Sequence, residues 1–162
     1  MSDDGQQNRD DDVWRRLVQS YNDFAAASKE FMSEGVDRVS LMREALRGRD
    51  RLTAIYMARY LDVAELEGLF DELVFLASFS HGAVQTVRDL ILSLPRERVL
   101  SRIEEAAEPL LSKGDYDEYR RLLELYSELD KSLALKLARR AADEEDEDIR
   151  EAGEDFLEKL RA

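Results

Sequence analysis

The chain has 162 residues, of which 44% are hydrophobic, and a formal net charge of −13. This length suits one continuous hydrophobic core, and the negative charge disfavours non-specific binding to the phosphate backbone of nucleic acids. Because the sequence has no cysteine, it excludes disulfides, thiolate nucleophiles and cysteine-ligated zinc sites.

The first predicted segment, residues 1–12, contains several aspartates and no apolar residue after Met1. Such a segment buries too little apolar surface to offset the entropy lost on ordering, so we expect a disordered acidic tail. It also lacks the basic and then apolar run of a secretory signal, and no later stretch is apolar enough to span a bilayer. These observations favour a cytoplasmic protein that does not enter a membrane.

A long amphipathic helix is predicted from Val13 to about Gly35. Its apolar residues recur at steps of three and four, as one face of a helix requires. They are Val13, Trp14, Leu17, Val18, Tyr21, Phe24, Ala25, Phe31 and Met32. We expect this helix to cap the hydrophobic end of the helices that follow. The alternative is a detachable helix that docks in a groove of a partner.

Shorter amphipathic helices are predicted along the rest of the chain. The first lies between Asp37 and Gly48, and the next carries an apolar stripe of Leu52, Ile55, Tyr56 and Tyr60. Residues 73–76 are apolar nearly all round, so we place them at the centre of the core. We expect residues 13–162 to form a single all-helical domain, with N-terminal helices in residues 13–48 and helical-hairpin repeats in residues 49–162.

A repeat is indicated in the second half of the chain. Three predicted helices begin near Ser80, Asp115 and Glu147, at intervals of roughly 33 residues, which is typical of helical-hairpin repeats. Asp115 and Glu118 form a capping-box pattern at the second of these starts.

The stretch from Glu147 to Leu157 has an aspartate at the helix start, then Ile149-Arg150, Ala152 and the apolar pair Phe156-Leu157. This pattern resembles the first helix of HEAT-type repeats, most clearly over residues 130–162. The resemblance implies a right-handed stack of antiparallel hairpins that binds proteins, and it brings no catalytic residues. We therefore expect an all-α fold of antiparallel helical hairpins, stacked as a short HEAT-like α-solenoid or compact helical bundle with the long N-terminal helix as a cap.

No residue pattern predicts a catalytic, cofactor or metal site. His81 is the single histidine and has no nucleophile or metal-ligand spacing beside it, which favours a structural role. The glycines are isolated, so none forms a phosphate-binding loop. Carboxylate pairs are too frequent to single one out. We expect a protein that is not an enzyme, and a helical-bundle enzyme with a carboxylate site is a minor alternative.

Two charged clusters are candidate partner-binding sites. One is the arginine cluster Arg47, Arg49 and Arg51, and the other is the acidic loop Glu145, Asp146 and Glu147. In both places solvated ion pairs or helix-end charges are the simpler interpretation. Five tyrosines on or beside the apolar stripes are expected mainly to pack in the core, although a groove of tyrosines can bind a partner. They are Tyr56, Tyr60, Tyr116, Tyr119 and Tyr126.

The function that these patterns favour is a protein–protein interaction adaptor or regulatory subunit. Its partner is expected to be another protein, with homo-oligomerisation left open. The main alternative is an acidic inhibitor that mimics nucleic acid and occupies a basic groove, which predicts carboxylates along one face. Direct nucleic-acid binding through the arginine cluster is disfavoured by the net charge of −13.

Overall fold

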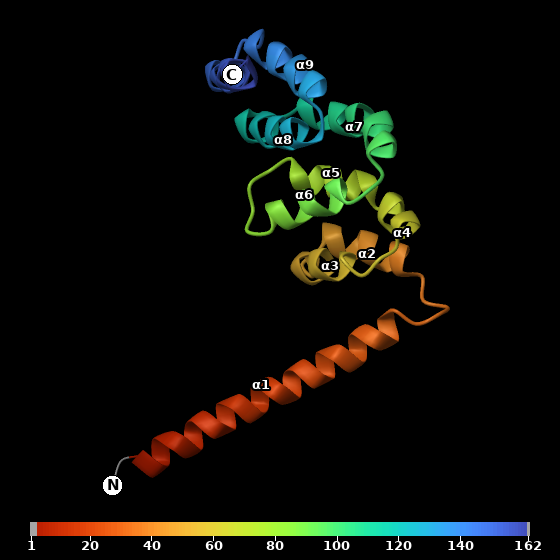
Figure 1. Ribbon diagram of the computed structural model, residues 1–162, viewed down its shortest axis with the longest axis vertical. Helices are drawn as coiled ribbons and strands as arrows, with labels where there is room; N and C mark the ends of the chain where they lie inside the picture. The colour runs from red at the N-terminus through yellow and green to blue at the C-terminus, as the bar shows by residue number, and fades with distance from the viewer. Residues whose placement is uncertain (1–2, 162) are drawn as a thin grey trace. The chain divides into compact units, whose positions relative to one another are not determined.

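The computed structural model describes residues 3–161, with side chains from Asn8 onward, and these residues form ten helices and no strand (Figure 1). The expected all-α class is therefore confirmed. The chain divides into two compact units, Met1–Arg38 and Val39–Ala162, where we expected a single domain over residues 13–162. Apolar periodicity shows that a helix has a hydrophobic stripe, but it does not show what that stripe packs against.

Unit 1 consists mainly of helix α1 (Asp3–Phe31). We expected residues 1–12 to be a disordered tail. Residues 1 and 2 lie outside the described residues, and from Asp3 onward the segment is helical. Asp12 pairs with Arg15 at 2.6 Å, and such i,i+3 pairs support a helix locally in a way that composition alone does not reveal. After α1, Gly35 has a φ of +86°, a left-handed backbone conformation that favours glycine.

Unit 2 contains the other nine helices of the described chain. They are α2 (Arg38–Arg47), α3 (Arg51–Ala58), α4 (Val63–Gly68), α5 (Phe70–Ala77), α6 (Val84–Leu92), α7 (Arg96–Leu111), α8 (Tyr116–Leu129), α9 (Lys131–Ala142) and α10 (Glu147–Arg161). Helix α5 packs against α6 and α7, α7 packs against α8, and α8, α9 and α10 pack against one another. Helix α3 contacts α6, and α6 contacts α8. All of these contacts join helices that are at most three places apart in chain order.

Two of the three predicted repeat helices begin where the sequence placed them. Asp115 caps α8 with the expected capping box, and α10 begins at Glu147. Helix α6 begins at Val84 rather than near Ser80, because Ser80 is held elsewhere. Its backbone N–H and its hydroxyl both donate hydrogen bonds, each of 2.6 Å, to the Asp117 carboxylate of α8.

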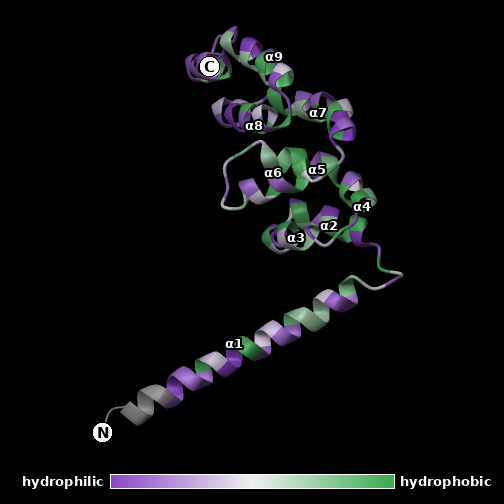
Figure 2. Cartoon of the chain, in the orientation of Figure 1, coloured by the Kyte–Doolittle hydropathy of each residue, from purple (hydrophilic) through white to green (hydrophobic). Residues whose placement is uncertain are grey.

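The core of unit 2 is centred on α5, which Figure 2 shows as almost wholly hydrophobic. Leu73, Val74 and Leu76 are fully buried, as we expected for residues 73–76, whereas Phe75 is 43% exposed. Close helix packing continues to the carboxyl end of the chain. A Cβ atom on Gly153 of α10 would lie 2.7 Å from the carbonyl oxygen of Ala138 in α9. Only a glycine permits this approach without a shift of the backbone.

Ion pairs at a nearly constant sequence interval join helices that are two or three places apart in chain order. Arg98 and Arg102 of α7 pair with Glu67 of α4 and Asp71 of α5, at 2.6 and 3.3 Å. Each of these partners is 31 residues away in the sequence.

The same arrangement recurs one step along the chain. Lys136 of α9 pairs with Glu104 of α7, and Arg140 of α9 pairs with Glu108 of α7, the second pair at 2.6 Å and both across 32 residues. In both steps, two cations spaced four residues apart contact two carboxylates spaced four residues apart.

Candidate protein-interaction surface

The outer side of α3 carries an exposed apolar surface flanked by two arginines. Leu52, Tyr56 and Tyr60 are 55%, 44% and 57% exposed, and the side chains of Arg49 and Arg59 are exposed beside them. We call these five residues the α3 face. Large apolar side chains grouped in this way are typical of interaction surfaces, since water solvates them poorly.

The expected inward packing of the α3 stripe is wrong for most of its residues. We expected Leu52, Ile55, Tyr56 and Tyr60 to form one stripe that packs inward, but only Ile55 is buried. Helix α3 has just eight residues and is apolar nearly all round, so periodicity does not determine which side faces the core. The small residues Ala54 and Ala58 are also buried and leave room for neighbouring helices to approach, which places the larger side chains outside.

A cation–π contact and a shallow hollow shape the α3 face. The guanidinium carbon of Arg59 lies 5.6 Å from the centre of the Tyr56 ring, which keeps a positive charge beside an exposed aromatic side chain. Arg49 and Leu52 line an open hollow of about 450 Å³ that extends to Gly82. A Cβ atom on Gly82 would meet nothing within 4 Å, so the hollow has room for side chains of a partner.

Two arginines of the predicted arginine cluster, Arg47 and Arg51, make contacts within unit 2. Arg47 donates a hydrogen bond of 2.5 Å to Glu72, which is 6% exposed and also lies 3.3 Å from Nε of Arg43. Arg51 donates to the carbonyl oxygen of Leu46 at 3.1 Å. Arg49 is exposed and has no ion pair with any described residue. Of the three, Arg49 is therefore the one that a partner could engage at no structural cost.

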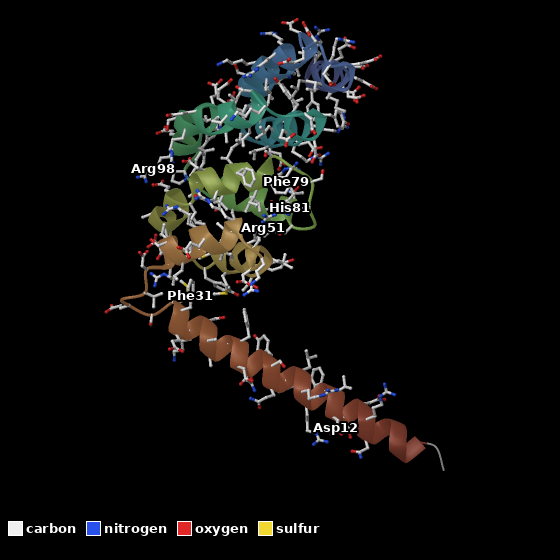
Figure 3. All side chains as sticks on the ribbon, turned by 180° about the vertical axis from the view of Figure 1, so that it is seen from behind. Asp12, Phe31, Arg51, Phe79, His81 and Arg98 are labelled. Atoms are coloured by element: carbon white, nitrogen blue, oxygen red, sulfur yellow. The ribbon has the colours of Figure 1, made fainter. Side chains whose placement is uncertain are left out.

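His81 stabilises the turn that borders the hollow. Figure 3 shows Arg51 near Phe79 and His81, and the Arg51 guanidinium carbon lies 5.7 Å from the centre of the Phe79 ring. The N–H of Ala83 donates to Nδ1 of His81 at 3.2 Å, so Nε2 carries the proton and donates to the carbonyl oxygen of Leu76 at 2.8 Å. Both ring nitrogens are thus used by the backbone.

The acidic loop between α9 and α10 also has structural contacts. Oδ1 of Asp146 accepts hydrogen bonds from the N–H groups of Asp148 and Ile149, at 3.0 and 3.1 Å, and so caps α10. Glu145 and Glu147 are exposed and their carboxylates have no partner among the described residues.

The residue before this loop is tied to the core. The Tyr119 hydroxyl donates a 2.6 Å hydrogen bond to Glu144, and burial together with this bond raises the pKa of Tyr119 to about 12.

The two predicted clusters lie at opposite ends of unit 2 (Figure 1), one beside the α2–α3 turn and the other beside the α9–α10 turn. They therefore do not form one site. The tyrosines divide as well, because Tyr119 and Tyr126 are buried in the core whereas Tyr56, Tyr60 and Tyr116 are exposed.

A row of carboxylates follows the exposed side of α10. It consists of four glutamates at steps of four, three and four residues, which places them on one face of the helix: Glu147, Glu151, Glu154 and Glu158. Lys159 and Arg161 lie in the last turn of the same helix. The row is therefore acidic over most of its length and ends beside two cations.

A second small hollow, of about 150 Å³, lies between α7 and α9 and contains Glu104, Glu108 and Tyr126. Both carboxylates are paired with cations of α9. Hydrogen bonds from Arg140 and Ser112 lower the pKa of Glu108, which favours its ionised form. These contacts make the hollow an inter-helix ion-pair site.

Within residues 3–161, no group of three or more histidine, aspartate or glutamate residues is placed to hold a metal ion. None of the described helices has both the length and the apolar composition that crossing a membrane requires. Comparisons with protein-family models, with curated proteins and with solved structures found no match to this chain.

Proposed function

We propose that the protein is a non-catalytic interaction adaptor or regulatory subunit, and that it binds an acidic and apolar segment of a partner protein on the α3 face. The observation that carries this proposal is the grouping of Leu52, Tyr56 and Tyr60 with two exposed arginines. Tyrosine and arginine are enriched among the residues that dominate binding energy at interfaces. When a partner covers half-exposed side chains of this size, each contributes about 1 kcal/mol to the free energy of binding.

The local charge favours an acidic partner segment. The stretch from Arg38 to Tyr60 holds six arginines, against Glu44 and Asp50 as its only acidic residues. It is therefore locally positive in a chain whose net charge is −13. Attraction within a Debye length of about 8 Å directs an acidic segment to this face, and the rest of the surface repels it.

We also infer that unit 2 is a short HEAT-like α-solenoid built from stacked helical hairpins. The support is the repeated interval of the ion pairs, in which α7 pairs with α4 and α5, and α9 pairs with α7, across 31 or 32 residues. This interval matches the spacing of helical-hairpin repeats. A stack of this kind leaves the outer side of its first hairpin without a neighbour, which accounts for an apolar α3 face.

A random-peptide display library screened with the full chain tests the proposal. We expect enriched peptides to combine acidic residues with leucine or aromatic residues. Tyr56→Ala should weaken their binding at least tenfold, as loss of an interface anchor does, and Arg49→Glu should abolish the preference for acidic residues.

Tyr116→Ala is the matched control for this screen. Tyr116 is 38% exposed on α8, and Arg120 lies over its ring at 5.7 Å, so it reproduces the tyrosine–arginine pair of the α3 face at another place. Binding should be unchanged by this variant. Enrichment of peptides without acidic residues would contradict the proposal. Equal losses of peptide affinity in Tyr56→Ala and Tyr116→Ala would contradict it as well.

A second candidate function rests on the carboxylate row of α10. We propose it as the alternative in which the protein mimics nucleic acid and occupies a basic groove. The helix rise places its glutamates roughly 5–6 Å apart along one face, and charge-dominated binding of this kind weakens steeply with added salt. A binding assay with the partner decides between the two functions. Loss of affinity when Glu151 and Glu154 are replaced by glutamine supports the nucleic-acid mimic, whereas loss of affinity with Tyr56→Ala supports binding on the α3 face.

A further inference from the structure

Helix α1 carries a heptad pattern that neither the α3 face nor the carboxylate row uses. The residues of its central seam follow one another at alternating steps of three and four: Trp14, Leu17, Tyr21, Phe24, Ser28 and Phe31. This alternation is the pattern of coiled-coil seams, in which each helix packs against another helix of the same kind. Helix α1 is continuous over all of these positions.

The seam is exposed along most of its length. Trp14, Leu17, Tyr21 and Phe24 are 64%, 58%, 69% and 49% exposed. A single helix in water gains little stability from its own hydrogen bonds, so an amphipathic helix of this length depends on packing of its apolar face. The exposed seam therefore requires a covering surface.

We propose that a second copy of the chain supplies this surface, and that two α1 helices pair antiparallel along their seams. The positions that flank the seam carry no charge, so two like copies do not repel each other there. These positions are Val13, Val18, Ser20, Ala25, Ala27 and Met32. A seam that is apolar at its centre and uncharged at both edges is complementary to itself.

The antiparallel direction follows from the charges at the N-terminal end of α1. Asp10, Asp11 and Asp12 lie toward its N-terminal end. A parallel pair would place six aspartates together, whereas an antiparallel pair separates the two sets at opposite ends of the pair. Antiparallel helix dipoles also attract each other.

Antiparallel pairing also fits the sizes of the seam residues. With the two copies centred between Tyr21 and Phe24, Trp14 lies opposite Phe31 of the second copy, and Leu17 lies opposite the small Ser28. Tyr21 and Phe24 of both copies then meet at the centre. Aromatic side chains bury about 150–250 Å² each, so the exposed seam offers on the order of 600 Å² per copy, and a pair reaches the roughly 1,200 Å² at which specific interfaces begin.

The charges of α1 disfavour a membrane surface as the occupant. Amphipathic helices that bind membranes carry mainly lysine and arginine on the polar face. Helix α1 instead carries at least as many acidic as basic residues, including Asp23 and Glu30 beside Arg15 and Arg16.

A dimer would present two α3 faces and thereby increase the apparent affinity for a partner with two binding segments.

Sedimentation equilibrium of the full chain tests the pairing. We expect a dimer with twice the 18.7 kDa mass of the chain. The double variant Tyr21→Glu, Phe24→Glu should raise the dimer dissociation constant at least roughly 100-fold, since it places charges at the centre of the seam. Ala26→Glu adds a negative charge on the opposite side of α1, so this control should change the constant less than about threefold. A monomeric wild type, or a dimer indifferent to the double variant, would overturn the proposal.

Cysteine cross-linking tests the direction, because the chain has no cysteine of its own. When the single variants Trp14→Cys and Phe31→Cys are mixed and oxidised, we expect the mixed disulfide to predominate over either symmetric one. Symmetric Trp14→Cys disulfides would instead indicate parallel helices. A disulfide within one chain that carries Trp14→Cys and Tyr56→Cys would show that α1 covers the α3 face. Either of the last two results overturns the antiparallel pair, and neither depends on the peptide screen for the α3 face.

Discussion

Replacing Gly153 by alanine tests the close contact between α9 and α10. The added Cβ atom would lie 2.7 Å from the carbonyl oxygen of Ala138 and 2.8 Å from the carbonyl carbon of Ala141, and closer still to the backbone nitrogen of Ala142. All three are backbone atoms, so no side-chain rotation relieves the overlap and α10 must move away from α9.

The expected cost follows from two opposing effects. Overpacking of a well-packed contact costs about 1–3 kcal/mol, and backbone neighbours place this site at the upper end of that range. Alanine in a helix gains roughly 1 kcal/mol relative to glycine, which offsets part of the loss. We therefore expect Gly153→Ala to lower the free energy of unfolding by about 2 kcal/mol.

Urea unfolding of the full chain, followed by circular dichroism, measures this change. Gly82→Ala is the matched control, since its Cβ atom would meet nothing within 4 Å. The control should leave stability unchanged or raise it slightly. If Gly153→Ala were as stable as the wild type, the packing of α10 on α9 described above would be wrong.

Three further predictions concern buried or capping side chains. Glu72→Gln should lower the free energy of unfolding by about 1–2 kcal/mol in urea titrations, because the buried carboxylate loses its charge-assisted bond from Arg47; an unchanged midpoint would contradict that role. The pKa of Tyr119 is about 12 in the folded protein and about 10 in the unfolded chain, so the folded state favours the neutral hydroxyl. Its contribution to the free energy of unfolding is therefore complete below about pH 10 and should be lost as the pH rises from about 10 to about 12. Tyr119→Phe should remove this part of the alkaline loss, and an identical pH profile in both proteins would refute the assignment. Asp146→Ala should cost about 1 kcal/mol through loss of the α10 cap, detectable as a lower thermal midpoint, whereas Glu145→Ala should cost nothing measurable.

Local sequence signals predicted much of the helical structure of this chain. The capping-box pattern of Asp115 and Glu118 located the start of α8, because these contacts need no tertiary partner. The start of α10 near Glu147 was also predicted, but its cap is Asp146, which was expected only as part of the acidic loop. The apolar residues of α8 occupy one side and are buried, except for Tyr116, which is 38% exposed. The one-sided stripe of α1 is exposed instead, so periodicity identifies an apolar side but does not by itself place it in a core.

The α3 face and the division into two units could not be predicted in this way. Helix α3 is apolar on both sides, so the choice of Ile55 rather than Tyr56 for the core depends on which neighbours fit against Ala54 and Ala58. The arginine cluster was found by composition, but composition does not distinguish Arg47, paired with a buried glutamate from α5, from the unpaired Arg49. Contacts between residues about 25 positions apart decide that difference.

Amide hydrogen exchange of the full chain, with and without a selected acidic peptide, tests whether the α3 face is the binding surface. We expect slower exchange on peptide addition in residues 49–60, which contain the α3 face, and no change in residues 147–158 of α10. Protection confined to α10, or no protection in α3 at saturating peptide, would contradict it.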